Sequence, residues 1–395
     1  MARRTVAVAL LVAPALGLAV LAVAIVATAG ARPGAPGLGA PTHFAVRQII
    51  GIGLAAGLGL LIVRVGVARL LRAAPVLFFI ALLATAAVFI PGIGVRAAGA
   101  SRWLHVGPLS GSPAPFLIGA TGLLMAAWSG TAPGGGDRRE RWRLATRALA
   151  LVLALLAVLV LVAQPDFSAA AVALAVTFAA LAGAGVGGRR LLPAAVVLVI
   201  ALALGASRFG YVGDRVRGFL SPESDRRGHG FEVLALARAK ANGAAGAVGL
   251  GHGTGRRHLS SPASDYVFAL VHEELGRLGA WAVIGGWVAI LAGAALATRS
   301  ARGDARRRGA AAGCAVALLA PAALHIAVSR GWMPITGVTM PFLSYDPALT
   351  VASGGEIGVL VAIALEREPI APAALDARTH AGDGAGAGAG EGQSA

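Results

Sequence analysis

The chain has 395 residues, of which 57% are hydrophobic and 13% are charged. A soluble domain carries about 25% charged residues, so the composition excludes an ordinary soluble enzyme and predicts a protein that lies mainly in lipid. The net charge of +16 does not indicate nucleic-acid binding, because the arginines lie in short segments between apolar runs. The single cysteine, Cys314, excludes a disulfide framework and a cysteine-based metal site.

The first apolar run, residues 5–29, follows a basic start and resembles a secretory signal. It is longer than the ~7–15 residues of a signal's apolar core, so we interpret it as the first membrane span. In chain order the predicted spans are 5–29, 44–63, 74–92, 113–129, 144–163, 167–186, 191–207, 278–298, 309–328 and 340–365. The pattern predicts an all-α polytopic membrane protein with about ten transmembrane helices in one domain, residues 1–368.

The basic residues predict the orientation of these spans. With the N-terminus inside, the cytoplasmic segments hold nineteen arginines and the short outer segments hold five. Both termini are therefore predicted to be cytoplasmic, and residues 208–277, between the seventh and eighth spans, form a large extracytoplasmic loop with amphipathic helices. Residues 369–395 are predicted to be a disordered cytoplasmic tail, because they offer too little apolar surface to bury.

Two segments are unusually polar for simple loops. In "PGIGVRAAGASRWLHVGP", Arg102 and Trp103 fit a membrane interface, where tryptophan prefers the headgroup layer and arginine extends towards it. In "FEVLALARAKANGAAGAVGLGHGTG", residues 231–255, a short amphipathic helix ends in Arg238 and Lys240 and a glycine-rich run follows. Glycine-rich backbone beside cations can bind phosphate; a flexible loop that touches anionic headgroups is the alternative.

The segment "SDYVFALVHEELG", residues 264–276, places Asp265, Glu273 and Glu274 beside an apolar spacer. A helix that starts at Asp265 and continues through the eighth span would exceed the ~30 Å hydrocarbon core by several turns. Its first turns would then stand in the outer interface. Alternatively, Ser264 or Asp265 caps the helix, since either side chain can satisfy free amides of the first turn.

A fourth polar segment, residues 329–360, contains three prolines and several glycines, which predict a broken backbone before the last span. Helical spacing would place Glu356 ~15 Å from Asp346 and inside the span. An acid at membrane depth suggests a functional role. The alternative is a buried partner for an arginine such as Arg47 or Arg330.

These segments occur in the order and spacing of the SEDS family (shape, elongation, division and sporulation), which the chain resembles over roughly residues 5–366. The matching motifs are "FAVRQIIGIGLAAG", "GASRWLHVGP", "AQPDFSAAAVALAVTFAALAGAG", "RAKANGAAGAVGLGHGTG", "SDYVFALVHEELGRLGA" and "GWMPITGVTMPFLSY". Three stretches depart from the family pattern: "SGSPAPF", "SSPAS" and the "DPAL" that follows "PFLSY". The chain therefore resembles a divergent member.

The resemblance implies a multi-pass peptidoglycan glycosyltransferase of the bacterial cytoplasmic membrane, acting in cell division or cell elongation. Such an enzyme polymerises lipid II, the undecaprenyl-pyrophosphate-linked precursor, at the outer face and works with a class B penicillin-binding transpeptidase. The resemblance also implies that Asp265 is catalytic; chemically, it would act as a general base in an inverting reaction. The candidate substrate-binding residues are Arg47, Gln48, Arg102, Trp103, Lys240, Glu273, Glu274, Ser344 and Tyr345.

Nothing in the sequence requires a cofactor, although a divalent cation (Mg²⁺ or Mn²⁺) near Asp265 or Glu273 is a candidate. Two other functions fit the sequence. Glu356 fits a flippase for the lipid-linked precursor, because transport needs polar groups at membrane depth. The altered motifs fit a non-catalytic scaffold that recruits the transpeptidase.

Overall fold

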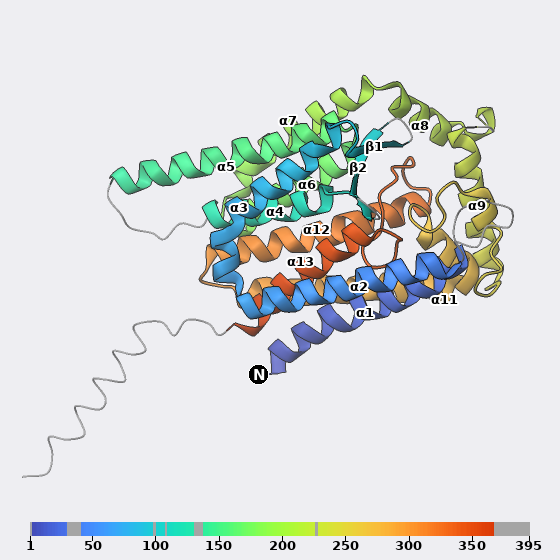
Figure 1. Cartoon of the computed structure of the whole chain (residues 1–395), viewed down its shortest axis with the longest axis horizontal. Coiled ribbons are helices and arrows are strands. Elements are labelled where there is room, and N and C mark those ends of the chain that lie inside the picture. Colours follow the sequence, from blue (N-terminus) through green and yellow to red (C-terminus); the bar gives the residue numbers. More distant parts are fainter. Residues whose placement is uncertain are drawn as a thin grey trace, which may run out of the picture.

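The computed structural model describes residues 2–29, 41–97, 100–106, 109–129, 137–225 and 228–366. Most of them lie in helices that run roughly side by side (Figure 1). The long helices are α1 (Ala2–Ala29), α2 (Pro41–Val65), α3 (Val67–Ala86), α4 (Ala114–Ser129), α5 (Asp137–Ala163), α6 (Phe167–Gly183), α7 (Gly188–Ser207), α11 (Val267–Ser300), α12 (Ala305–Ser329) and α13 (Pro347–Leu365).

Each predicted span overlaps one of these helices. Eight are long and apolar enough to cross a membrane, whereas α4 and α6 are apolar but shorter. The all-α polytopic membrane fold is therefore confirmed. The number ten stays a prediction, because it depends on the two short helices within the described part of the chain.

Several predicted boundaries were wrong. The third span was predicted as residues 74–92, but α3 covers Val67–Ala86 and a 3-10 turn, η1 (Ala87–Phe89), follows. The eighth span was predicted from residue 278, but α11 begins at Val267. The last span was predicted from residue 340, but α13 begins at Pro347. Asp346 caps it, since its carboxylate accepts a hydrogen bond from the Leu349 amide at 3.0 Å.

A small antiparallel sheet, which the sequence did not predict, lies between α3 and α4. It consists of β1 (Gly94–Ala97), β2 (Ala100–Val106) and β3 (Leu109–Gly111), in that order. The strands are too short for their alternation to be distinguished from an irregular interfacial segment. The sheet carries Arg102 and Trp103 on its central strand.

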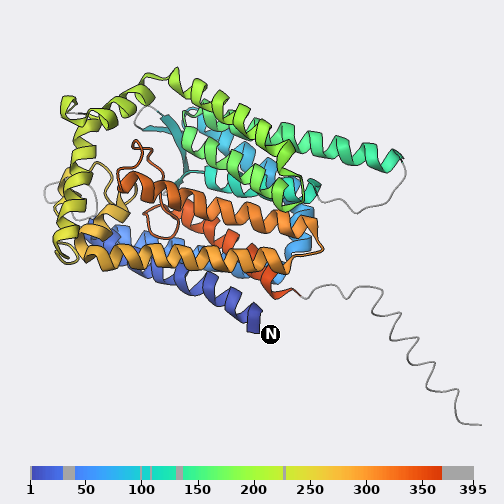
Figure 2. The same ribbon diagram turned by 180° about the vertical axis from the view of Figure 1, so that it is seen from behind.

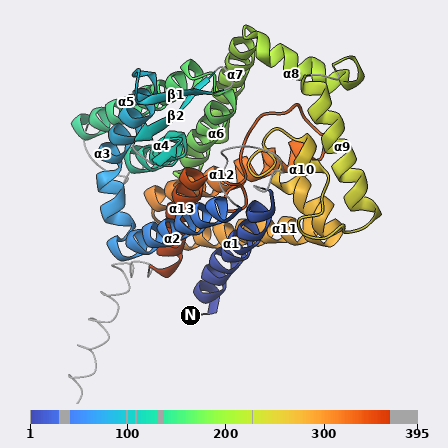
Figure 3. The same ribbon diagram turned by 45° about the vertical axis from the view of Figure 1, so that its right-hand side comes forward.

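The sheet and the helices of the predicted loop gather at one end of the bundle, on the right in Figure 1 and on the left when seen from behind (Figure 2). The loop contains α8 (Gly210–Leu220), η2 (Pro222–Ser224), α9 (His229–Ala245) and α10 (Gly255–His258). Figure 3 shows α8 and α9 arching around this end. The predicted tail, residues 369–395, lies outside the described residues.

Helices α2 and α13 approach each other through glycine. A Cβ added to Gly354 would lie 2.4 Å from the Ala55 carbonyl oxygen, and one on Gly358 would lie 2.6 Å from that of Gly59. Small residues permit such close approach between membrane helices, where packing replaces the hydrophobic effect as the driving force. The backbone of α13 therefore lies directly against α2.

We expect Gly354→Leu to destabilise the fold, because the added side chain would force α2 and α13 apart at a cost of roughly 1–3 kcal/mol or more. Gly57→Leu on α2 is the matched control, since a Cβ there meets nothing within 4 Å among the described residues. The measurement is the melting temperature of each purified variant in detergent. Equal melting temperatures for the two variants would contradict the packing.

Candidate functional site

Asp265 lies in the turn that precedes α11. The helix begins at Val267, and Tyr266 occupies its cap position without a capping hydrogen bond from a side chain in this described segment. The capping alternative for Ser264 or Asp265 was therefore wrong. The predicted continuous helix was also wrong, because Gly276 (φ 67°, ψ −163°) interrupts α11 in a backbone conformation that favours glycine.

The loop between α12 and α13, residues 331–346, packs against this turn. The Ser344 hydroxyl donates to the Ser264 carbonyl at 2.6 Å, and the Tyr345 amide donates to the Ala263 carbonyl at 2.9 Å. Gln48 on α2 donates from Nε2 to the Ser344 carbonyl at 3.4 Å. The structure thus brings three predicted site residues, Gln48, Ser344 and Tyr345, to the turn that carries Asp265.

The Asp265 carboxyl is half-buried at this junction. A Cβ added to Gly337, which has φ 70°, would lie 3.7 Å from Asp265 Oδ2, so the loop backbone passes close to the carboxyl. Burial raises the pKa of Asp265 to about 6, and the nearby Glu232 and Asp346 add to the increase. A hydrogen bond with Ser264 and the charge of Arg215 oppose it.

Arg215 on α8 is a functional candidate that the sequence analysis missed. Its Nη1 donates to the Thr336 carbonyl at 3.3 Å, and its guanidinium lies 5.4 Å from the centroid of the Tyr211 ring. The Tyr211 hydroxyl donates to the Pro165 carbonyl at 2.8 Å. Pro165 also accepts a hydrogen bond from Arg102, so α8 connects the Arg102 segment with the surroundings of Asp265.

Arg102 is held by the turn between α5 and α6. Its Nε donates to the Gln164 carbonyl at 3.4 Å and lies 3.8 Å from Asp166 Oδ2. The neighbouring Trp103 on β2 is 38% exposed. The side-chain contacts of Arg102 anchor the sheet to the bundle, and the predicted substrate contacts of both residues stay predictions.

Glu273 is completely buried in the first segment of α11. Its Oε1 accepts hydrogen bonds from the Thr254 amide at 3.1 Å, the Thr254 hydroxyl at 2.9 Å and the Asn242 side chain at 2.8 Å. Its Oε2 accepts from the Gly255 amide at 2.9 Å. Glu273 therefore holds the end of the glycine-rich segment that follows α9.

Glu274, equally buried, holds the same segment from another side. One carboxylate oxygen pairs with Arg256, and the other accepts from the Gly251 amide at 3.0 Å. Arg256 also donates to the Thr28 carbonyl at the end of α1, at 2.9 Å. The contacts of the two glutamates position the glycine-rich loop, while their predicted contact with substrate stays untested.

Three further residues from the sequence analysis, Lys240, Arg47 and Glu356, lie on α9, α2 and α13. Lys240 on α9 is exposed and donates to the Arg330 carbonyl at 3.4 Å, and Arg47 is half-buried on α2. Glu356 is buried in α13, and its Oε2 has no hydrogen-bond partner among the described residues. No ion pair links Glu356 to an arginine in that part of the chain, so the predicted arginine partner is not observed.

His325, a buried residue of α12, joins the two segments that meet at Asp265. Its Nδ1 lies 2.7 Å from the Val338 carbonyl oxygen, and the Phe268 amide donates to its Nε2 at 3.4 Å. A carbonyl only accepts, so Nδ1 carries the proton. The sequence analysis missed His325; the signal that could have found it is a lone histidine in the apolar run "AALHIAVS", since ionisable residues at membrane depth are rare.

The family model for FtsW, RodA and SpoVE, described as "cell cycle protein", matches residues 6–368. The chain belongs to this family. The predicted SEDS membership is therefore confirmed, and the protein is an integral protein of the bacterial cytoplasmic membrane.

Two relatives are named "Probable peptidoglycan glycosyltransferase FtsW". The protein from Trichlorobacter lovleyi is 29% identical over 299 residues, 73% of this chain and 74% of the relative. The protein from Alcanivorax borkumensis is 29% identical over 361 residues, 89% of this chain and 91% of the relative.

Solved structures agree with the fold. A chain of a peptidoglycan synthase complex, described as coordinating polymerization and crosslinking, matches with a TM-score of 0.66 at 26% identity, covering 88% of this chain and 97% of that one. RodA from Thermus thermophilus matches with a TM-score of 0.65 at 22% identity, covering 91% of this chain and 97% of that one.

We expect Asp265→Asn to be more stable than the unmodified protein above pH 6 and equally stable below pH 4. The pKa of about 6 exceeds the usual 3.8, so the folded state favours the protonated carboxyl, and this contribution is lost as the pH rises through 6. The measurement is the melting temperature across this range. Asp214→Asn, which removes an exposed acid on α8, is the control and should not gain stability over the unmodified protein as the pH rises.

We expect His325→Phe to loosen the junction, because it removes both hydrogen bonds while it keeps an aromatic ring. Leaving the Val338 carbonyl and the Phe268 amide unsatisfied costs roughly 1–3 kcal/mol each. Hydrogen–deuterium exchange should increase in residues 331–346 relative to His252→Phe, which alters an exposed histidine. Unchanged exchange in that loop would rule out the positioning role.

Proposed function

We propose that this chain is a peptidoglycan glycosyltransferase that polymerises lipid II at the outer face of the cytoplasmic membrane, with Asp265 as general base. The names of the two FtsW relatives and the likeness to a peptidoglycan synthase complex support the reaction. The observation that carries the role of Asp265 is its position. The carboxyl lies half-buried at the junction, does not cap helix α11, and has its pKa raised to about 6.

A carboxylate with this pKa suits proton transfer near neutral pH. It is ionised at pH 7 and more basic than an ordinary aspartate, which favours removal of a proton from a sugar hydroxyl. As the hydroxyl loses its proton to Asp265, its oxygen attacks the anomeric carbon of the other substrate and the bond from that carbon to pyrophosphate breaks. Attack opposite the leaving group inverts the configuration, so an α-linked pyrophosphate gives a β-1,4 glycosidic bond.

The departing pyrophosphate requires positive charge, because negative charge develops on it in the transition state. Arg215 is the cation whose charge acts on Asp265, and we add it to the candidates Arg102, Lys240 and Arg47. Arg215 also stacks on Tyr211 and bonds to the Thr336 carbonyl. Its guanidinium is thus held near the junction before any substrate binds.

The two buried glutamates act on the glycine-rich loop in this proposal. Glu273 uses both carboxylate oxygens in hydrogen bonds to that loop, so it is poorly suited to bind a divalent cation beside Asp265. No group of three His, Cys, Asp or Glu side chains in the described ranges could hold a metal ion.

The arrangement of charges supports the proposed orientation. The starts of α1, α3 and α12 lie at the end of the bundle opposite the start of α11 (Figure 1) and carry Arg4, Arg72 and Arg307. Basic residues favour the cytoplasmic side of a membrane. We propose that both termini are cytoplasmic and that the junction faces outwards, where a class B penicillin-binding transpeptidase would be the partner.

The proposal is tested by purifying the chain together with its cognate transpeptidase and following the polymerisation of labelled lipid II on gels. We expect Asp265→Asn to lose at least about 100-fold of the rate, as removal of a general base commonly does. The rate of the unmodified protein should fall as the pH drops below about 6, because protonation removes the base. Asp214→Asn should keep both the rate and this profile; full activity in Asp265→Asn would refute the assignment.

Glu356 supports a second candidate, transport of the lipid-linked precursor across the membrane. Its buried carboxyl has an unpartnered oxygen within the described residues and faces Gly119 of α4, where a Cβ would lie 3.4 Å from Oε1. In that case Glu356→Gln would abolish translocation in vesicles, whereas Asp265→Asn would not. If the chain were a non-catalytic scaffold, the unmodified protein would bind the transpeptidase but form no glycan.

A further inference from the structure

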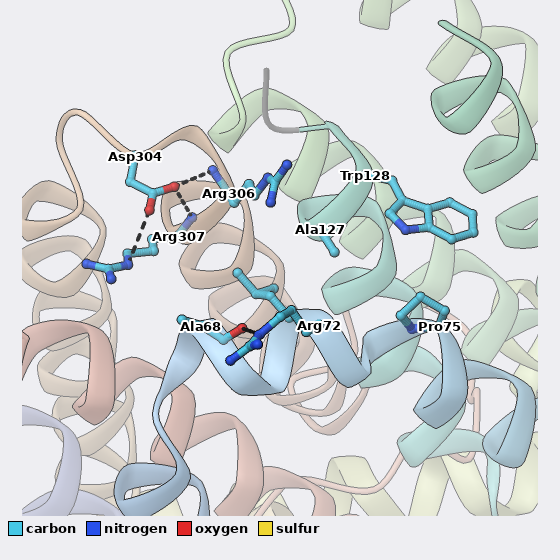
Figure 4. Close-up of a pocket in the computed structure, with 9 residues that line it drawn as sticks. Ala68, Arg72, Pro75, Ala127, Trp128, Asp304, Arg306 and Arg307 are labelled. Atoms are coloured by element: carbon cyan, nitrogen blue, oxygen red, sulfur yellow. Dashed lines mark hydrogen bonds and ion pairs between the residues drawn. The ribbon is translucent and has the colours of Figure 1, made fainter. Parts of the chain in front are cut away.

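A cavity of about 530 Å³ lies at the end of the bundle opposite Asp265 (Figure 4). It opens between the start of α3, the end of α4 and the start of α12. Its volume is in the range of about 300–1,000 Å³ that is usual for small-molecule sites. The proposed glycosyltransferase reaction does not use it.

The polar side of the cavity is positively charged. Arg72, Arg306 and Arg307 line it together with one acid, Asp304. Arg307 is neutralised, since it pairs with Asp304 at 3.2 Å and with Glu366 at 2.9 Å. Figure 4 shows Arg307 turned back to Asp304 while Arg306 extends towards α4.

Arg72 keeps its charge at the rim. Its side chain is exposed, its Nε donates to the Ala68 carbonyl at 3.4 Å, and no carboxylate pairs with it in the described ranges. A planar guanidinium binds phosphate oxygens well. The cavity is therefore suited to an anion that carries phosphate.

The other side of the cavity is apolar and continues into the lipid-facing surface of α3. Leu71, Pro75, Ala127 and Trp128 form this side. Beyond it, Val76, Phe79 and Leu83 follow Arg72 at spacings of four, three and four residues, so they share its helix face. They are 61%, 46% and 69% exposed, which in a membrane means contact with acyl chains.

We infer that this cavity binds the phosphate headgroup of an anionic glycerophospholipid, with an acyl chain lying along α3. A lipid accounts for both the cationic and the apolar side, whereas free phosphate would use only the arginines. Arginine-lined pockets between helices on the cytoplasmic side of a membrane favour anionic headgroups. Trp128 at the rim matches the preference of tryptophan for the interface.

Native mass spectrometry of the full chain, titrated with phosphatidylglycerol or phosphatidylcholine, tests this inference. We expect the unmodified protein to prefer phosphatidylglycerol, and the double variant Arg72→Gln/Arg306→Gln to bind it roughly tenfold more weakly. Arg299→Gln/Arg302→Gln is the matched control, because it removes two exposed arginines at the same end that do not line the cavity. The control should stay within about twofold of the unmodified protein.

Equal losses in the two double variants, or no preference between the lipids, would overturn the inference. Displacement of the bound lipid by inorganic phosphate at a similar concentration would do so too, since it would assign the site to a soluble anion. If the double variant fails to fold, the single variants decide the matter. Arg72→Lys should retain the binding that Arg72→Gln loses, and equal binding by both would contradict the charge-based site.

Discussion

The hydrogen bonds between residues 263–264 and residues 344–345 hold the candidate site together. They join two segments eighty positions apart, and each comes just before a membrane helix, α11 or α13. Asp265 lies immediately beside this connection, and Gln48 ties it to α2. A carboxyl on a turn would be mobile by itself; here the two helix starts and the buried His325 restrict it.

The two buried glutamates order the glycine-rich loop that follows α9. A loop with little side-chain surface cannot be ordered by packing, because glycine contributes no apolar area and has a large conformational entropy to lose. Glu273 and Glu274 instead bind its amides and the Arg256 side chain. Burying two carboxylates is tolerable only because their oxygens have these partners. Both glutamates lie in the first segment of α11, directly after the turn that carries Asp265, and this couples the loop to the candidate site.

The two ends of the bundle differ in chemistry. The Asp265 end has a sheet, two surface helices and both acids and cations, among them Arg215, which suit the proposed reaction of a polar glycan. The opposite end has arginines around a cavity that continues into a lipid-facing helix surface. Close glycine packing between α2 and α13 forms part of the bundle that connects these ends. We therefore propose that the bundle combines a site for glycan chemistry at one end with a site for an anionic lipid at the other.

The sequence by itself determined the membrane class, the approximate spans and the family. Apolar runs and six ordered motifs are local patterns that can be recognised without a structure. It also singled out Asp265, Glu273 and Glu274, since acids beside apolar runs are costly. Only the tertiary structure decided what each acid touches. Arg215, Glu232 and His325 come from helices distant in sequence, and the Gly276 interruption turns one expected helix into two segments. Contacts of this kind depend on how helices pack in three dimensions, which no local pattern encodes.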